Sequence, residues 1–137
     1  MNDLNVLCPR WKELRDAARD ARGRAWAPYS KYLVGAAALS DTGKIFIGCN
    51  VENASYGLTV CAERVAMCSA VAAGHRDIQA LCVSLTSVAV PCGACRQFLH
   101  EFNPQLCVLL DDLSLSDESP PEILRLSELL PRAFRLN

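Results

Sequence analysis

The sequence predicts an α/β fold of three layers, α-β-α, with helices on both faces of a mixed five-stranded sheet. One observation is the helical spacing of apolar residues at 9–25, and another is the nearly continuous apolar run at 78–85, typical of a central strand. Predicted strands and helices also alternate along the chain. With 137 residues, 51% of them hydrophobic, we expect a single domain over residues 1–137.

The first third of the chain predicts a helix followed by a β-hairpin. Residues 9–25 form the helix, because apolar side chains recur every three or four positions, and Pro28 ends it. Residues 34–39 and 44–48 are expected to be strands. The sequence Ser-Asp-Thr-Gly at 40–43 lies between them and is typical of a turn.

The rest of the chain alternates between helix and strand. Thr59 is a candidate N-cap for the next helix, and Pro91 suits the start of the one after it. The predicted elements, in order, are a helix at 59–73, a strand at 78–85, a helix at 92–102, strands at 106–110 and 123–126, and a helical turn at 128–130.

Charge and hydropathy argue against two classes of partner. The net charge is −1, from 14 basic and 15 acidic residues, so no general field attracts a nucleic acid polymer and a small neutral ligand is favoured. No apolar run reaches the ~20 residues that a membrane-spanning helix needs, and the N-terminus lacks the pattern of a secretion signal. We therefore expect a cytoplasmic protein that binds neither nucleic acid nor a membrane.

The chain has eight cysteines, which is many for a cytoplasmic protein. Without a secretion signal, they indicate metal binding or burial rather than disulfides. Cys82 and Cys107 lie within apolar runs and are expected in the core. On the predicted helix Cys68 lies about 10 Å beyond Cys61 along the axis, which is far for two ligands of one metal ion. Cys68 is therefore also expected in the core.

Two short segments carry the chemistry. Cys92 and Cys95 form a C-x-x-C motif, and Cys61 offers a third sulfur with Glu63 two residues further on. Three thiolates leave the fourth position of a tetrahedral zinc ion open, which is typical of catalytic sites. Glu63 would then serve as the general acid and base beside that open position.

Three thiolates carry more negative charge than one zinc ion neutralises, so a nearby cation is expected. Arg64 and Arg96 directly follow the two cysteine segments, and hydrogen bonds from a guanidinium to a thiolate would draw charge away from the metal.

Less specific interpretations stay open for these residues. A C-x-x-C motif alone also occurs in thioredoxin-like redox proteins and in structural zinc sites. A closed structural site could take its fourth ligand from Cys68, His75 or His100. The full combination, with the glutamate and both cysteine segments, favours a catalytic zinc site.

With these motifs the chain resembles the small zinc-dependent cytidine deaminases that act on free nucleosides. The resemblance runs from about residue 25 to residue 134 and covers six segments: Pro-Tyr-Ser-Lys at 28–31, Val-Gly-Ala-Ala at 34–37, Gly-Cys-Asn-Val-Glu-Asn-Ala-Ser-Tyr at 48–56, Cys-Ala-Glu-Arg at 61–64, Pro-Cys-Gly-Ala-Cys-Arg-Gln at 91–97 and Glu-Leu-Leu-Pro at 128–131.

The resemblance implies the fold of that family and its reaction, the hydrolytic deamination of cytidine and 2′-deoxycytidine in pyrimidine salvage. Cys61, Cys92 and Cys95 would bind one zinc ion per chain. Zinc-bound hydroxide would attack C4 of the base, while Glu63 moves a proton to N3 and then to the leaving ammonia. The backbone around Ala62 would meet the amino edge of the base.

The resemblance also implies substrate and subunit contacts. Asn50 and Glu52 match the pair that holds the ribose 3′-hydroxyl. Tyr32 stands near the pyrimidine at a position that is usually phenylalanine, so its hydroxyl needs a partner. Family members are generally homotetramers, and Tyr56 and Phe134 match positions that contribute across subunits.

Two departures from the family concern substrate preference and assembly. The segment at 86–90 is shorter than usual and has no acidic residue, and the chain ends soon after Phe134, where relatives often continue. Two alternatives to cytidine deamination stay open. One is a deaminase of a related cytosine nucleoside, such as a nucleoside antibiotic, and the other is a non-enzymatic structural zinc module.

Overall fold

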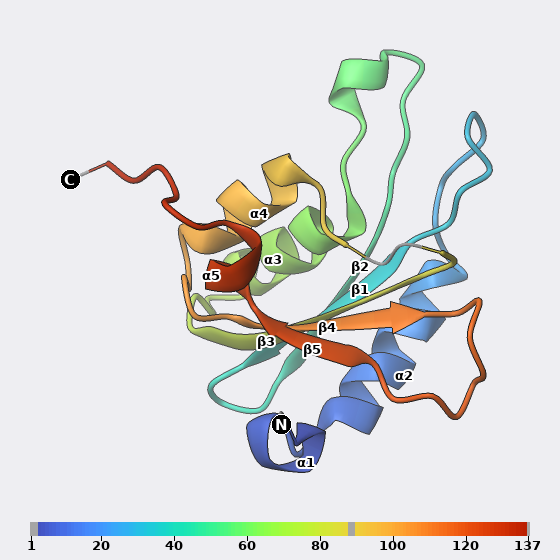
Figure 1. The fold of residues 1–137 in the computed structure, drawn as a ribbon. Helices are drawn as coiled ribbons and strands as arrows, with labels where there is room; N and C mark the ends of the chain where they lie inside the picture. Colours follow the sequence, from blue (N-terminus) through green and yellow to red (C-terminus); the bar gives the residue numbers. More distant parts are fainter. Residues whose placement is uncertain (1–2, 88–89, 137) are drawn as a thin grey trace.

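A computed structural model describes residues 3–87 and 90–136, and Figure 1 shows how its elements are arranged. The helices are α1 (Leu4–Leu7), α2 (Trp11–Arg22), α3 (Ala62–Ala72), α4 (Gly93–His100) and α5 (Leu126–Leu129), with a short 3-10 helix η1 (Tyr56–Leu58). The strands are β1 (Gly35–Ser40), β2 (Ile45–Cys49), β3 (Ile78–Leu85), β4 (Cys107–Asp112) and β5 (Glu122–Arg125).

The strands form one mixed sheet in the order β2-β1-β3-β4-β5, which confirms the predicted fold class. β1 pairs antiparallel with β2 and with β3, β3 pairs parallel with β4, and β4 pairs antiparallel with β5. Helix α2 covers one face of the sheet, and α3, α4 and α5 lie on the other (Figure 1). Each face has its own apolar core, so the sheet is buried on both sides.

Small residues in the sheet let helices approach closely from both faces. All six residues of β1 are buried. A Cβ atom on Gly35 would lie 2.0 Å from the carbonyl oxygen of Ala18 in α2. A Cβ atom on Gly48 would lie 2.5 Å from the carbonyl oxygen of Ala62 in α3. Gly48 therefore sets the position of the first turn of α3 against β2.

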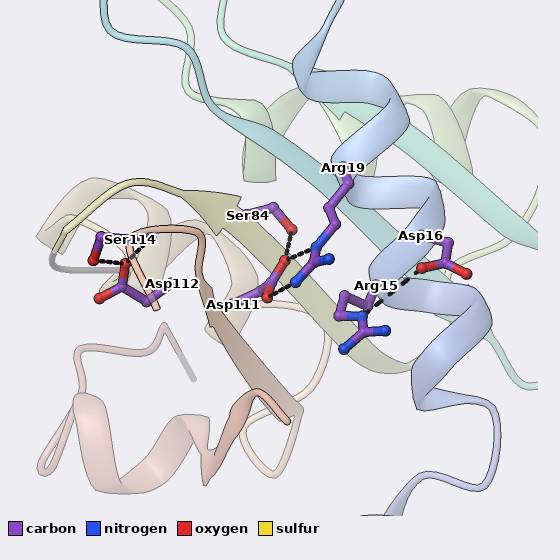
Figure 2. A network of polar contacts seen from close by, with 7 residues as sticks. All are labelled: Arg15, Asp16, Arg19, Ser84, Asp111, Asp112 and Ser114. Carbon is purple, nitrogen blue, oxygen red and sulfur yellow. Dashed lines mark hydrogen bonds and ion pairs between the residues drawn. The ribbon is translucent and has the colours of Figure 1, made fainter. Parts of the chain in front are cut away.

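The face covered by α2 holds a buried ion pair, drawn in Figure 2. Asp111 at the end of β4 is 1% exposed. Arg19 of α2 donates two hydrogen bonds to its carboxylate, from Nε at 2.8 Å and from Nη2 at 2.9 Å. Ser84 of β3 donates a third at 2.7 Å. Because both carboxylate oxygens are bonded, the fold itself compensates this buried charge and fixes α2 on the sheet.

The start of α3 differs from the prediction. Its N-cap is Cys61, and Thr59 precedes the helix, directly after η1. The reason is a pairing that local sequence does not reveal: Val60 forms an antiparallel bridge with Val51, which keeps the backbone extended up to the cysteine.

The other differences concern exposure and the N-terminus. Cys82 and Cys107 are buried as predicted, but the prediction for Cys68 was wrong, because this residue lies on an exposed side of α3. Helix α1 was not predicted; Asp3 caps it by accepting a hydrogen bond from the backbone of Asn5. None of the helices in the described residues has the length and apolar character that crossing a membrane requires.

Candidate metal centre and substrate cavity

The three cysteines of the motif lie at the starts of two helices. Cys61 is the N-cap of α3, Cys92 is the N-cap of α4, and Cys95 follows in the first turn of α4. Strands β2 and β3 both run antiparallel to β1, so their C-terminal ends share one edge of the sheet. Because α3 follows β2 and α4 follows β3, both helix N-termini lie at that edge, where their dipoles favour thiolates.

The sulfur atoms converge at the spacing that a zinc ion requires. The Sγ atoms of Cys61, Cys92 and Cys95 all lie within 4.8 Å of one another. The distance from Cys61 to Cys92 is 3.9 Å, and that from Cys92 to Cys95 is 3.6 Å. A tetrahedral zinc ion with Zn–S bonds of ~2.3 Å needs sulfurs about 3.8 Å apart, so this donor set fits zinc with one position left open.

The sulfurs share their protons unequally. A hydrogen bond with Cys95 and one from Arg64 lower the pKa of Cys61 to about 5, against the opposing effect of burial. The same contact with Cys61 raises the pKa of Cys95. The two thiols thus compete for one proton, since two thiolates in contact repel each other. A divalent cation bound between them would remove this repulsion, which is a second reason that the site fits a metal.

The two arginines that follow the cysteines make different contacts. Arg64 donates from Nη2 to Cys61 Sγ at 3.5 Å, the guanidinium–thiolate contact expected from the sequence. Arg96 instead donates from Nε to the carbonyl of Pro91 and from Nη1 to the carbonyl of Leu129, both at 2.8 Å. The thiolate contact predicted for Arg96 is therefore absent among the described residues, because its side chain ties the start of α4 to α5.

Glu63 is a buried carboxylate beside the sulfurs. It is 4% exposed, on the first turn of α3. Burial raises its pKa, and the negative charge of Cys61 adds to this effect, while the neighbouring Cys95 partly opposes it. No ion pair reaches Glu63 from within residues 3–87 and 90–136. Its carboxyl group therefore holds a proton more readily than an ordinary glutamate does.

A cavity of about 310 Å³ opens beside these groups. Its wall includes Cys61, Ala62, Glu63 and Cys92 from the two helix starts, and apolar side chains from the sheet. Further lining residues come from the loop before β1 and from the segment after β2: Ser30, Tyr32, Val34, Asn50, Glu52 and Thr59. A cavity of this size, mostly apolar with a few convergent polar groups, is typical of a small-molecule site.

Asn50 and Glu52 both line this cavity and organise the loop that faces it. Asn50 accepts a hydrogen bond from Val34 N at 2.9 Å and donates one to the carbonyl of Tyr32 at 2.8 Å. Glu52 accepts hydrogen bonds from Tyr29 N at 3.0 Å, from Ser30 N at 3.1 Å and from the Ser30 hydroxyl. These bonds leave the amide one N–H and the carboxylate one lone pair for a ligand.

The aromatic residues singled out in the sequence occupy different places. Tyr32 lines the cavity, and its hydroxyl donates to the carbonyl of Thr86. Tyr56 lines an adjacent cavity of about 390 Å³ and packs its ring edge against Tyr29, with the centroids 5.9 Å apart. Phe134 is 70% exposed on the C-terminal tail and lines neither cavity. Its backbone carbonyl accepts a hydrogen bond from Gln97 at 3.0 Å.

Sequence reasoning missed Ser30 and Thr59 as cavity residues. Thr59 lies two residues before Cys61 on an extended segment and so points to the same side, but because the sequence predicts a helix from residue 59, alternation offered no signal for it. Ser30 sits between Tyr29 and Lys31 in a loop, where no periodicity applies. Val88 and Ala89, in the segment at 86–90 that looked short, lie outside the described residues.

Comparisons with known proteins point to one family. Residues 10–110 match the family model described as the cytidine and deoxycytidylate deaminase zinc-binding region. The chain is 43% identical to a cytidine deaminase of Mycobacterium tuberculosis over 129 residues, 93% of this chain and 91% of the relative. It is 44% identical to a cytidine deaminase of Halalkalibacterium halodurans over 120 residues, 85% of this chain and 88% of the relative.

Solved structures agree with the sequence relatives. The crystal structure of cytidine deaminase from Burkholderia pseudomallei matches with a TM-score of 0.83 and 45% identity, covering 90% of this chain and 98% of that one. The crystal structure of cytidine deaminase from Mycobacterium tuberculosis matches with a TM-score of 0.76 and 42% identity, covering 92% and 98%. With this fold and three converging cysteines, the chain belongs to the family of zinc-dependent cytidine deaminases.

Proposed function

We propose that this chain catalyses the hydrolytic deamination of cytidine and 2′-deoxycytidine, releasing ammonia and forming uridine or 2′-deoxyuridine. The observation that carries the proposal is the buried Glu63 beside three converging thiols, in the same cavity as Asn50 and Glu52. A nucleoside needs both parts, since its base carries the amino group to be replaced and its sugar needs polar partners.

The residues divide the reaction between them. Zinc held by Cys61, Cys92 and Cys95 would activate a water molecule by lowering its pKa. Glu63 accepts one proton of the attacking water and delivers it to N3 of the ring. It then takes the proton of the new hydroxyl at C4 and delivers it to the leaving amino group, so that C4 becomes a carbonyl. The raised pKa of Glu63, which follows from its burial, suits a group that must hold a proton between two transfers. Water is consumed, ammonia leaves, and the carboxylate is regenerated.

The sugar contacts favour a free nucleoside over a polymer. The N–H that remains on Asn50 and the lone pair that remains on Glu52 match the acceptor and the donor of one hydroxyl group. In a polynucleotide the 3′-oxygen is esterified and cannot donate to a carboxylate. The proposed partner of this pair is therefore the 3′-hydroxyl of a free nucleoside.

An ultraviolet assay of ammonia loss across four compounds tests the proposal, together with metal analysis. We expect turnover of cytidine and 2′-deoxycytidine with one zinc per chain, and far less turnover of cytosine, which lacks the sugar. Preference for a blasticidin-like compound would favour the antibiotic alternative. A zinc-bound chain that deaminates none of the four would favour a structural zinc module, and an active zinc-free chain would contradict the proposed chemistry.

We further propose that the protein is a homotetramer in which Tyr56 and Phe134 complete sites on neighbouring subunits. In support, Tyr56 and Phe134 are largely exposed and do not line the 310 Å³ cavity that holds Glu63, and Trp26 and Leu58 are also exposed apolar residues. Sizing chromatography should give a tetramer, and Phe134→Ala should weaken substrate binding or assembly. A fully active monomer would contradict this proposal.

The cytoplasmic location stays a prediction.

A further inference from the structure

Tyr32 is held by three hydrogen bonds that connect different parts of the cavity. Its backbone N–H donates to Ser30 Oγ at 3.0 Å, and its carbonyl accepts from Asn50 Nδ2 at 2.8 Å. Its hydroxyl reaches across to donate to the carbonyl of Thr86, directly after β3. Tyr32 is 39% exposed, so its hydroxyl could bond to water, and burial does not force it into this contact.

The loop that carries Tyr32 needs such fixing. Lys31 has a φ of 61°, in the left-handed region that residues with a Cβ atom avoid. Its neighbours Tyr29 and Ser30 are exposed, so packing gives the loop little support. Hydrogen bonds to Glu52 and Asn50 hold one side of the loop, and the Tyr32 hydroxyl holds the other.

Thr86 connects this tether to the middle of the sheet. It follows β3, which lies at the middle of the sheet, paired with β1 on one side and β4 on the other. The last residue of β3, Leu85, is buried and lines the same cavity as Tyr32. A bond to this point therefore fixes the tyrosine relative to the sheet and not merely to its own loop.

We propose that the Tyr32 hydroxyl is a tether that positions the sugar-binding loop against the end of β3, coupling the base wall of the cavity to Asn50 and Glu52. The inference rests on the proposed function. The coupling follows from shared partners: Ser30 Oγ accepts from Tyr32 N and donates to Glu52, while Asn50 binds the Tyr32 carbonyl. Tyr32 is thus a positioning residue for the sugar, besides any contact of its ring with the base.

The variant Tyr32→Phe isolates the tether, because it removes one oxygen atom and keeps the ring. Its kinetics are compared with wild type on cytidine and on 3′-deoxycytidine, which lacks the hydroxyl assigned to Asn50 and Glu52. We expect KM for cytidine to rise about two- to tenfold, the range that one net hydrogen bond is worth, with kcat and zinc content nearly unchanged. KM for 3′-deoxycytidine should change by less than about twofold, because that substrate does not use the sugar contacts.

A second variant tests whether a change in KM comes from the tether and not from a general loss of folded structure. Ser30→Ala breaks the chain of hydrogen bonds at its other end and should show the same selective rise in KM for cytidine, with less than additive effect in the double variant. An unchanged KM in Tyr32→Phe, or an equal rise for both substrates, would overturn the tether. Failure of the wild-type protein to deaminate cytidine would contradict the proposed function instead, so the two failures are distinguishable.

Discussion

Two carboxylates are buried on opposite faces of this sheet, and they have different surroundings. Asp111 is 1% exposed and receives three hydrogen bonds, two from Arg19 and one from Ser84. Glu63 is 4% exposed and has no ion-pair partner within residues 3–87 and 90–136. The hydrogen bond with Asp111 raises the pKa of Arg19, whereas burial raises the pKa of Glu63 itself.

The comparison separates a structural carboxylate from a reactive one. Where the fold supplies every partner, a buried charge is fixed and serves to join elements, here α2 to β4. Where the fold leaves a buried carboxyl group without a counter-charge, as at Glu63, the group can gain and lose a proton, and a bound ligand can supply the missing partner. Burial alone therefore does not identify a catalytic acid; burial without a counter-charge, beside a ligand cavity, is what distinguishes Glu63 from Asp111.

The largest expected effect is on catalysis, from Glu63→Gln. Glutamine keeps the shape but cannot carry the proton, so kcat should fall by about 10²–10⁴-fold. Zinc content and the free energy of unfolding should not fall, since the change removes a buried acid without a counter-charge. The measurements are steady-state kinetics, elemental analysis and urea unfolding; wild-type turnover would remove Glu63 from the mechanism.

Asp111→Asn should act on stability instead. It leaves Arg19 without its counter-charge and should lower the free energy of unfolding by about 3 kcal/mol, the low end for such pairs because 23% of the Arg19 side chain is exposed. Urea unfolding measures the change, and kcat per folded enzyme should stay within about twofold.

The adjacent Asp112 provides a matched control for that variant. Its carboxylate accepts two hydrogen bonds from Ser114, from N at 2.9 Å and from Oγ at 2.6 Å, and no arginine pairs with it among the described residues. Figure 2 shows the two aspartates side by side in sequence but with different partners. Asp112→Asn should change the free energy of unfolding by less than about 1 kcal/mol. Equal losses in the two variants would mean that the buried pair is not what stabilises this region.

A smaller effect is expected from the arginine beside the sulfurs. Arg64→Ala removes the guanidinium that bonds Cys61 and should lower kcat about tenfold, a size common for groups that support metal ligands. Arg96→Ala should mainly lower thermal stability, because it loses two carbonyl contacts and none to sulfur. A normal kcat in Arg64→Ala with a reduced one in Arg96→Ala would transfer the charge-compensating role to Arg96.

The sequence was informative where local pattern and topology agree. Apolar runs located the strands, and the motif around Pro91 placed Cys92 and Cys95 at a helix start. It was less informative where distant residues decide. The bridge between Val51 and Val60 delays α3 to Cys61, and no local signal reports it.

Exposure and side-chain direction were the other limits. Small residues on several sides of α3 made its exposed side look buried, so Cys68 was misplaced. The side-chain direction of Arg96 depends on a carbonyl in α5, 33 residues further along the chain. The partners of Asn50 and Glu52 lie in the loop before β1, and the partner of the Tyr32 hydroxyl lies after β3, so only the folded chain brings them together.

Gly48 touches neither the cysteines nor the cavity, yet it bears on metal affinity. A Cβ atom there would lie 2.3 Å from Ala66 N and 2.5 Å from Ala62 O, so even alanine would displace α3. Since Cys61 moves with α3 while Cys92 and Cys95 move with α4, such a displacement changes the sulfur spacing. A substitution at this one position would thus lower zinc affinity from a distance, with the ligands themselves left intact.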